Sequence, residues 1–278
     1  RNYLTRRIPT IIRVDGKAFH TFTRGFERPF DSIMAESMQR TMKYMCENIS
    51  GCVLGYTQSD EITLLLIDYK KKNQGAWFGY VKRKVETIAA SMATMAFNEA
   101  FSDVITEKIS EDIMKVQNDE EAEKVKDYYF KYVKKCGRAM FDARAFNIPE
   151  FEVVNEFIWR QQDCTRNSIQ SVGHANFSDK KMHKKNMSQI QDMLMLKKGI
   201  NWNDFPTFLK RGSCCIKEDY FIPEDELPEN HRNNLSPRTL DPEEDEYGVW
   251  RSRWVIDKEI PIFTQNKNYV NDLFLNKH

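Results

Sequence analysis

Two stretches near the start of the chain combine short apolar runs with carboxylates. Residues 8–14 read I-P-T-I-I-R-V and lead into Asp15, while residues 53–68 hold Asp60 between two further apolar runs. Apolar, β-branched runs of this length, broken by glycine or aspartate, predict buried strands. We therefore expect Asp15 where one strand stops and Asp60 at the tip of a hairpin.

Two helices are predicted around these strands. After the first strand, apolar side chains recur at the three- and four-residue spacing of one helical face: Met34, Met38, Met42, Met45 and Ile49. A methionine stripe can line a soft binding groove, but we interpret this one as core packing against a sheet. A longer helix is predicted from about residue 79 to residue 101, with an apolar side formed by Val85, Ile88, Met92 and Met95.

The remaining pattern completes an order of elements that belongs to a known fold class. Residues 110–133 are highly charged and predict a peripheral helical insertion over about 104–136, and residues 137–147 alternate as a fourth strand. Strand, helix, strand, strand, helix, strand is the split βαβ, or ferredoxin-like, arrangement. We therefore predict an α+β fold, with a polymerase- or cyclase-type palm (βαββαβ) in residues 1–150 and an α/β appendage in residues 151–278.

The second half of the chain is predicted to contain helices and a β-hairpin. Residues 159–168 read W-R-Q-Q-D-C-T-R-N-S in a helical context, so they must pack against something polar. Within that run, Asp163 and Arg166 fit a structural ion pair as well as they fit contact with a bound partner. Residues 251–256 are predicted to pair with residues 213–216.

The two carboxylates of the first half predict a metal site. If the strands that begin at residues 8 and 62 are antiparallel neighbours, Asp15 and Asp60 meet at one edge of the sheet. Two carboxylates there repel one another unless cations lie between them. Two Mg²⁺ ions are the usual solution, and phosphoryl or nucleotidyl transfer is their usual chemistry.

The composition limits the class of protein. The 42 basic and 41 acidic residues give a formal net charge of +1, which excludes a strongly basic nucleic-acid binder but leaves local patches, as at Lys180, Lys181, Lys184 and Lys185. The six cysteines show no C-x-x-C spacing, so we expect reduced thiols, no structural zinc and an intracellular protein. No apolar run reaches the length of a membrane span. We expect no membrane partner and a cytoplasmic or mitochondrial location.

Three motifs in order carry a family resemblance. They are R-V-D-G-K-A-F-H at residues 13–20, G-Y-T-Q-S-D-E at 55–61 and W-R-Q-Q-D-C at 159–164, followed by G-I-N-W-N-D at 199–204 and R-S-R-W-V-I at 251–256. Together they resemble the tRNA(His) guanylyltransferase family, and more closely its guanylyltransferase-like branch of 3′–5′ nucleotide polymerases. The resemblance implies a palm fold and a homotetramer, with tRNA, GTP, ATP and other nucleoside triphosphates as partners.

The resemblance also implies roles for individual residues. Two Mg²⁺ ions are implied at Asp15, the main-chain carbonyl of Gly16, and Asp60, with Glu61 beside them as a third candidate catalytic residue. The nucleotide pocket is implied at Lys17, Ala18, Phe19, His20 and Ser59, together with two cations that match phosphate-binding positions, Arg28 and Lys84.

One departure from the family pattern bears on the substrate. Where true tRNA(His) guanylyltransferases carry a His-Ile-Asn-Asn-Leu-Tyr-Asn run that helps to recognise tRNA(His), residues 165–171 here read T-R-N-S-I-Q-S. We therefore predict a 3′–5′ nucleotidyltransferase that adds nucleotides to the 5′ end of truncated tRNA, templated by the opposite strand. The expected RNA contacts are largely sequence-blind: Arg166, Asn167, Lys180, Lys181, Lys184, Lys185, Lys210 and Arg211.

Three alternatives stay open at this point. The first is a tRNA(His) guanylyltransferase that adds the extra 5′ G. The second is a nucleotide cyclase or cyclic-dinucleotide synthase, which also holds two metals at a palm edge. The third is a non-catalytic RNA-binding protein. Incubation with each nucleoside triphosphate and a 5′-truncated tRNA separates them by product.

Overall fold

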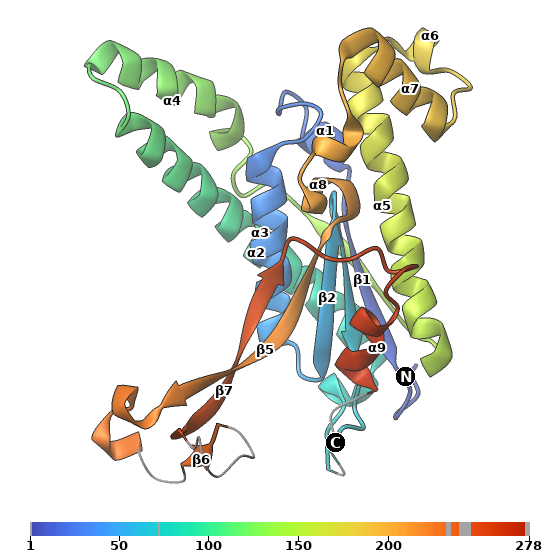
Figure 1. Ribbon diagram of the computed structural model, residues 1–278, viewed down its shortest axis with the longest axis vertical. Helices are drawn as coiled ribbons and strands as arrows, with labels where there is room; N and C mark the ends of the chain where they lie inside the picture. Colours follow the sequence, from blue (N-terminus) through green and yellow to red (C-terminus); the bar gives the residue numbers. More distant parts are fainter. Residues whose placement is uncertain (1, 72, 232–234, 239–245, 276–278) are drawn as a thin grey trace.

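The computed structural model describes residues 2–71, 73–231, 235–238 and 246–275 (Figure 1). Its strands form one sheet in the order β4-β1-β3-β2-β5-β7-β6, in which every neighbouring pair is antiparallel. The strands are β1 (Thr10–Gly16), β2 (Cys52–Gln58), β3 (Glu61–Leu66), β4 (Phe141–Asn147), β5 (Ser213–Pro223), β6 (Ser236–Pro237) and β7 (Tyr247–Asp257).

Helices cover both faces of the central strands. The helices are α1 (Phe19–Phe22), α2 (Ser32–Asn48), α3 (Lys82–Ile113), α4 (Asp119–Val133), α5 (Val153–Asn176), α6 (Asp179–Met182), α7 (Met187–Lys198), α8 (Thr207–Arg211) and α9 (Asn268–Phe274). Short 3₁₀ helices lie at Trp77–Tyr80, Glu150–Glu152, Trp202–Asp204, Glu224–Glu226 and Glu229–His231. None of the helices in the described part of the chain is long and apolar enough to cross a membrane.

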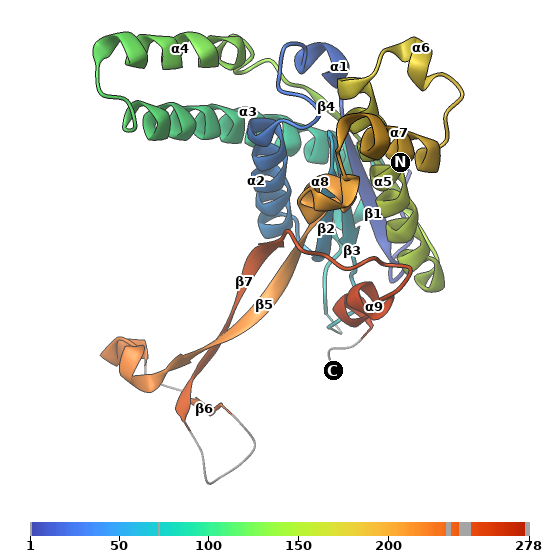
Figure 2. The same ribbon diagram turned by 45° about the horizontal axis from the view of Figure 1, so that its top comes forward.

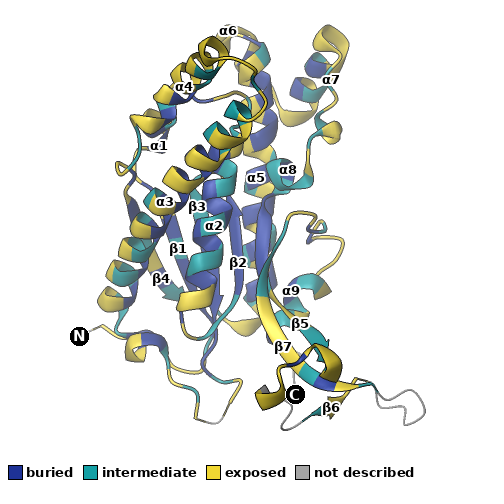
Figure 3. Cartoon of the chain, turned by 90° about the vertical axis from the view of Figure 1, so that its left-hand side faces the viewer, coloured by how far each residue is buried: buried dark blue, intermediate teal, exposed yellow. Residues whose placement is uncertain are grey.

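The core lies on both sides of the sheet, because alternate side chains along a strand point to opposite faces. Ile12 and Val14 of β1 pack into the cluster that α2 and α3 cover. Ile11 lies in the opposite cluster with Phe157 of α5 and Phe274 of α9. Figure 3 shows the buried strands between these helices. Strands covered on both faces read as unbroken apolar runs, and this explains the pattern at residues 8–14.

The methionine stripe of α2 is core packing, as predicted. Met38, Met42 and Met45 are at most 1% exposed and belong to the cluster beneath α2 and α3. The helix begins after Asp31, whose side chain accepts a hydrogen bond from the backbone N–H of Met34.

The second helix is longer than predicted. The predicted apolar side is wrong at Met95, which is 50% exposed, because the buried stripe follows Val85, Ala89, Ala93 and Phe97. This stripe continues past residue 101 through Val104 and Ile105, which share a cluster with Tyr129 and Tyr132 of α4. The predicted charged insertion is therefore the end of α3 together with α4, and this helical pair projects from the sheet (Figure 2).

The second half of the chain extends the same sheet. β5 pairs with β2, and the predicted hairpin is confirmed by the register Cys215↔Ile256 between β5 and β7. Beyond the sheet these two strands continue as a projecting ribbon (Figure 1). The division of the chain at residue 150 stays a prediction, and both predicted parts contribute strands to one sheet.

Candidate active site at the sheet edge

The structure brings the two predicted carboxylates together. β1 and β3 are antiparallel neighbours, Asp15 stands opposite Glu61, and the backbone N–H of Gly16 donates to the carbonyl of Asp60 over 3.1 Å. Ser59 and Asp60 form the two-residue turn between β2 and β3, where Ser59 has a φ of 51°. Asp15 is the last residue but one of β1, so it lies where the strand stops, as predicted, and β1 pairs with β3 and β4 up to this edge of the sheet.

Neither carboxylate is neutralised by a cation within hydrogen-bond or ion-pair distance among the described residues. Asp60 accepts a 3.1 Å hydrogen bond from the Ser59 hydroxyl. Burial raises the pKa of Asp60. Burial also raises the pKa of Asp15, and the nearby charges of Asp60 and Asp142 raise it further. This edge of the sheet therefore concentrates negative charge that a bound cation would stabilise.

The donor set fits magnesium. In the described part of the chain, no group of three or more histidine, cysteine, aspartate or glutamate side chains is arranged to hold a metal ion. A metal at this edge would therefore rest on Asp15, Asp60 and the main-chain oxygen of Gly16. Mg²⁺ accepts such a sparse set of oxygen ligands because it keeps several waters and binds substrate phosphates.

Glu61 differs from the two aspartates because it is paired. Its carboxylate lies 3.1 Å from Nη1 of Arg160 on α5 and 4.0 Å from Nε of Arg13, and Arg13 also donates to Glu156. Burial raises the pKa of Glu61, and the two arginines oppose that rise. In this structure Glu61 therefore joins β3 to α5, and its charge is already matched.

The polar run on α5 packs against polar partners, as its composition required. The side-chain amide of Gln161 donates to the carbonyl of Pro261 over 2.9 Å and accepts from the N–H of Phe263 over 2.8 Å. The hydroxyl of Ser168 accepts from Nε1 of Trp202 over 2.8 Å. This run therefore fixes α5 against the sheet edge and against the segment that precedes α8.

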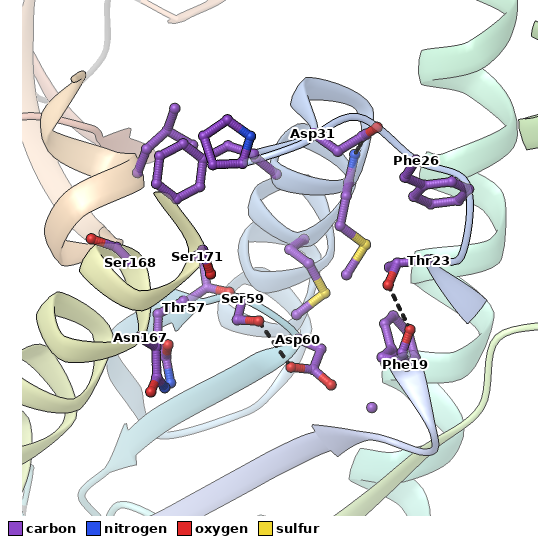
Figure 4. A pocket seen from close by; sticks show the side chains of 18 of the residues that line it. Phe19, Thr23, Phe26, Asp31, Thr57, Ser59, Asp60, Asn167, Ser168 and Ser171 are labelled. Atoms are coloured by element: carbon purple, nitrogen blue, oxygen red, sulfur yellow. Dashed lines mark hydrogen bonds between the residues drawn. The ribbon is translucent and has the colours of Figure 1, made fainter. Parts of the chain in front are cut away.

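A cavity of about 780 Å³ opens beside the carboxylates. It lies among α1, the start of α2, the β2–β3 turn, α5 and α8 (Figure 4). Its walls include many of the predicted nucleotide and RNA residues: Gly16, Ala18, Phe19, His20, Arg28, Ser59, Asp60 and Asn167. Asp15, Lys17 and Glu61 adjoin these residues in sequence but do not line the cavity. Phe19 contributes a buried wall, since its ring packs with those of Phe22 and Phe97.

The turn after β1 has little steric freedom. A Cβ on Gly16 would lie 2.3 Å from a ring carbon of Phe19, so a larger residue would displace that ring. Ala18 adopts a φ of 54° at the start of α1. The D-G-K-A-F-H motif is therefore a tight turn that carries the chain directly from Asp15 to the cavity wall.

Several polar residues of the cavity were not predicted from the sequence. Gln39, Thr57 and Ser213 line the cavity, and the Gln39 amide donates to the Ser213 hydroxyl over 3.2 Å. Asp31 also lines it while it caps α2 and accepts from the Tyr132 hydroxyl. Gln39 lies next to Met38 on the buried side of a helix, and a polar residue in that position was the available signal.

The structure does not bring Lys84 to the cavity. Glu86, one half-turn further along α3, accepts a hydrogen bond from the backbone of Ala145, which pairs with Ile12. Lys84 therefore lies toward the beginning of β1, at the opposite end of the strand from Asp15, with its ammonium 4.4 Å from the Phe78 ring centre. The prediction that Lys84 lies near the carboxylate edge of its own chain is therefore wrong.

The predicted RNA contacts fall into two groups. Lys180, Lys181, Lys184 and Lys185 are exposed around α6 and make no ion pair among the described residues. The others are engaged in the fold. Lys210 is buried and donates to the carbonyl of Asn203, so it does not present its charge to solvent as predicted. Arg211 is half-buried, and its carbonyl accepts from the Tyr56 hydroxyl. Arg166 is exposed and pairs with Asp163, which was the structural alternative.

Comparison with known proteins gives consistent results. The family model described as "Thg1: tRNAHis guanylyltransferase" matches residues 1–149. An uncharacterised protein of Acanthamoeba polyphaga mimivirus is 30% identical over 217 residues, which are 74% of this chain and 69% of that protein. A solved bacterial tRNA(His) guanylyltransferase (Thg1)-like protein in complex with ATP is 38% identical, with a TM-score of 0.75 over 99% of this chain and 94% of that one.

A second structure agrees with the first. A bacterial protein of the same description, in complex with GTP, is 35% identical with a TM-score of 0.69, again over 99% of this chain and 94% of that one. The matched family region contains both carboxylates and the turn after β1. The chain therefore belongs to the tRNA(His) guanylyltransferase (Thg1) family of nucleotidyltransferases.

Proposed function

We propose that this protein is a 3′–5′ nucleotidyltransferase that adds nucleotides to the 5′ end of truncated tRNA, using the opposite strand as template. The observation that carries the proposal is the pair of unneutralised carboxylates: Asp60 lines a cavity of about 780 Å³, and Asp15 directly precedes Gly16, which also lines it. That volume suits a nucleotide. The relatives in complex with ATP and with GTP support a purine nucleoside triphosphate as its occupant.

The order of strands supports a polymerase-type palm. The first four strands lie in the order β4-β1-β3-β2, and the connections follow the predicted βαββαβ sequence of elements. In this arrangement the end of β1 and the β2–β3 turn meet at one edge. We propose that this edge is the catalytic face of a palm, although fold alone does not define chemistry.

The residues of the site have distinct tasks in the proposed reaction. Two Mg²⁺ ions, held by Asp15, Asp60 and the Gly16 carbonyl, would supply charge stabilisation for the triphosphate and for the attacking hydroxyl. The 3′-hydroxyl of the incoming nucleotide attacks the 5′ phosphate of an RNA that carries a 5′ phosphoanhydride. A new P–O bond forms, the P–O bond of the anhydride breaks so that its outer part leaves as AMP or pyrophosphate, and the hydroxyl proton passes to solvent. Arg28, which lines the cavity, would contact phosphate oxygens. Glu61, paired with Arg160, holds the turn in position.

The choice of template over fixed G addition rests on α5. Asn167, Ser168 and Ser171 line the cavity and lie within residues 165–171, where the family's tRNA(His)-reading run is absent. With no specific reader there, base pairing to the opposite strand selects the incoming nucleotide. The alternative is the activity in the family's name, addition of G to tRNA(His).

The decisive assay changes the template base opposite the gap in one 5′-truncated tRNA and measures which nucleoside triphosphate is incorporated. We expect the complement of each template base, on several tRNAs, and no addition by Asp60→Ala. Addition of G whatever the template, and only to tRNA with the histidine anticodon, would replace this proposal with the guanylyltransferase activity. A cyclic nucleotide as product, or no product, would overturn both. The predicted homotetramer is tested separately by light scattering.

A further inference from the structure

The end of α4 and the turn after β1 form a basic surface beside the cavity. We call it the α4 ledge and define it by four cations: Lys17, Lys131, Lys135 and Arg138. The backbone N–H of Lys17 donates to the carbonyl of Met140 over 2.8 Å, and the ammonium of Lys135 lies 3.2 Å from the carbonyl of Thr21. Residues 131–140 therefore lie alongside α1, as Figure 2 shows.

Charge is distributed unevenly along α4. Its first turn carries Asp119, Glu120 and Glu121, and the lysines in the middle pair with acidic neighbours, Lys124 with Glu120 and Lys126 with Glu123. The four ledge cations make no ion pair with any residue that the structure describes. Figure 2 shows that α4 begins away from the catalytic edge and ends beside it. The acidic residues of α4 are therefore far from that edge, and the unpaired cations are next to it.

Aromatic rings contact two of the ledge lysines, Lys131 and Lys135, without neutralising their charge. The Lys131 ammonium lies 4.2 Å from the ring centre of Tyr128 and 4.9 Å from that of Tyr132, and the Lys135 ammonium lies 5.9 Å from that of Phe22. A cation–π contact orients an ammonium while it keeps its full charge. The hydroxyls of Tyr128 and Tyr132 in turn donate to Glu27 and Asp31 in the loop before α2.

The ledge is distinct from the nucleotide cavity. None of its four cations lines the cavity, whose own arginines are Arg24 and Arg28. The triphosphate of a bound nucleotide can use those two arginines, so the ledge is available for phosphates that lie outside. A strand of RNA whose 5′ end reaches Asp15 and Asp60 has such phosphates on its following nucleotides.

We propose that the α4 ledge binds backbone phosphates of the acceptor stem of the RNA substrate, next to the 5′ end under reaction. The proposal rests on the proposed function, and it places this contact beside α1 rather than on the lysines around α6. Contacts of this kind fix the position of a duplex without reading its sequence. They also make binding depend on salt, with a slope of about 0.9 per phosphate contact in a log–log plot.

The test compares a variant that loses three unpaired cations at and just after the end of α4 with a control that loses two paired cations in the middle of α4. Lys131→Gln, Lys135→Gln and Arg138→Gln together remove three ledge charges and keep aliphatic stems against the rings; Lys17 stays, because it belongs to the motif at the cavity. The control, Lys124→Gln with Lys126→Gln, removes cations that are already paired. Binding of a fluorescent 5′-truncated tRNA is measured by anisotropy across a salt series, together with the KM for GTP at saturating RNA and the Tm of each protein.

We expect the ledge variant to lower the magnitude of the salt slope by roughly 2.7, about 0.9 for each cation. Its KM for GTP and its Tm should match the wild type, and the control should keep the wild-type slope. A ledge variant with the wild-type slope, in a protein whose wild type extends the RNA, overturns the ledge and leaves the proposed function in place. An unchanged RNA affinity with a raised KM for GTP would assign the ledge to the nucleotide instead. A wild type that neither binds nor extends RNA overturns both proposals.

Discussion

Replacing Arg160 with methionine removes the main cation that faces Glu61 between α5 and β3. The Arg160 side chain is 9% exposed, that of Glu61 is 13% exposed, and their closest atoms are 3.1 Å apart. Methionine keeps an unbranched stem of similar length in the helix, but the carboxylate loses its partner in a place with little water. We therefore expect Arg160→Met to be destabilising chiefly through the carboxylate that stays behind.

The size of the loss follows from the geometry. Breaking a buried ion pair by removing one partner costs about 3–5 kcal/mol. Arg13 remains, with its Nε 4.0 Å from Glu61, so we place the loss at the lower end, about 3 kcal/mol. One kcal/mol shifts the Tm of a domain of this size by roughly 2–4 °C. The Tm of Arg160→Met should therefore fall by roughly 6–12 °C.

A double-mutant cycle measured by urea unfolding isolates the pair. Glu61→Gln removes the charge that Arg160→Met leaves unpaired, so the double variant should be more stable than the sum of the single losses by about 1–3 kcal/mol. Arg253→Met is the matched control. Arg253 is also 3.1 Å from its partner Glu218, but these side chains are 61% and 50% exposed, so the loss should stay within about 1 kcal/mol.

The pH dependence of stability tests the same cause independently. Burial already raises the pKa of Glu61 against the two arginines, and without Arg160 that pKa rises further in the folded state. Ionisation of Glu61 then opposes folding. The loss of unfolding free energy in Arg160→Met should therefore shrink as the pH falls through the raised pKa of Glu61. The Glu61→Gln background should show no such change. The reasoning would be refuted if Arg160→Met lost less than about 0.5 kcal/mol of unfolding free energy, if the two single losses were strictly additive, or if the loss did not depend on pH.

Three further predictions concern the site itself. Asp15→Asn and Asp60→Asn should each abolish nucleotide addition and leave the circular dichroism spectrum unchanged; near-normal turnover in either would contradict the metal assignment. In metal-free buffer Asp15→Asn should have a higher Tm than the wild type at neutral pH, because the raised pKa of Asp15 means that its ionisation opposes folding. The difference in Tm should vanish toward about pH 4. A lower Tm for Asp15→Asn at neutral pH would be inconsistent with repulsion between the carboxylates. Arg28→Ala should raise the KM for GTP roughly 10-fold or more, since a hydrogen bond to a charged group contributes about 1.5–3 kcal/mol, while Lys84→Ala should leave it unchanged; equal effects of the two would show that the phosphates are misplaced.

The sequence predicted the strands and the carboxylate edge because both rest on local pattern. The apolar runs around Asp15 and Asp60 predict strands, and antiparallel pairing then determines which strand ends meet. Placement across the fold was harder. The family resemblance implied that Lys84 binds phosphate near the carboxylates, and the sequence pattern does not show which end of the sheet the helix begins at. The hydrogen bond from the backbone N–H of Ala145 to Glu86 shows that it begins at the other end.

Partners of buried polar groups were the other limit. The polar run on α5 was seen to need polar neighbours, but nothing in its composition identifies Glu61 or Trp202 as those neighbours. Lys210 illustrates the same limit from the opposite side. It reads as a surface cation next to Arg211, yet a backbone carbonyl and the Trp202 ring receive its ammonium. Long-range pairing of this kind depends on the topology, which single-sequence pattern does not encode.

The two-sided core has a consequence for the chain as it leaves the ribosome. Once residue 150 has emerged, β1 to β4 and the helices α2 and α3 can assemble, and one face of the sheet is then closed. The opposite face, with Ile11, Leu54 and Leu65, stays uncovered until α5 and then α9 have been synthesised. During that interval a broad apolar surface faces solvent, and exposed surfaces of this kind drive aggregation of partly made proteins. Synthesis of this protein is therefore expected to depend on chaperones until α9 docks.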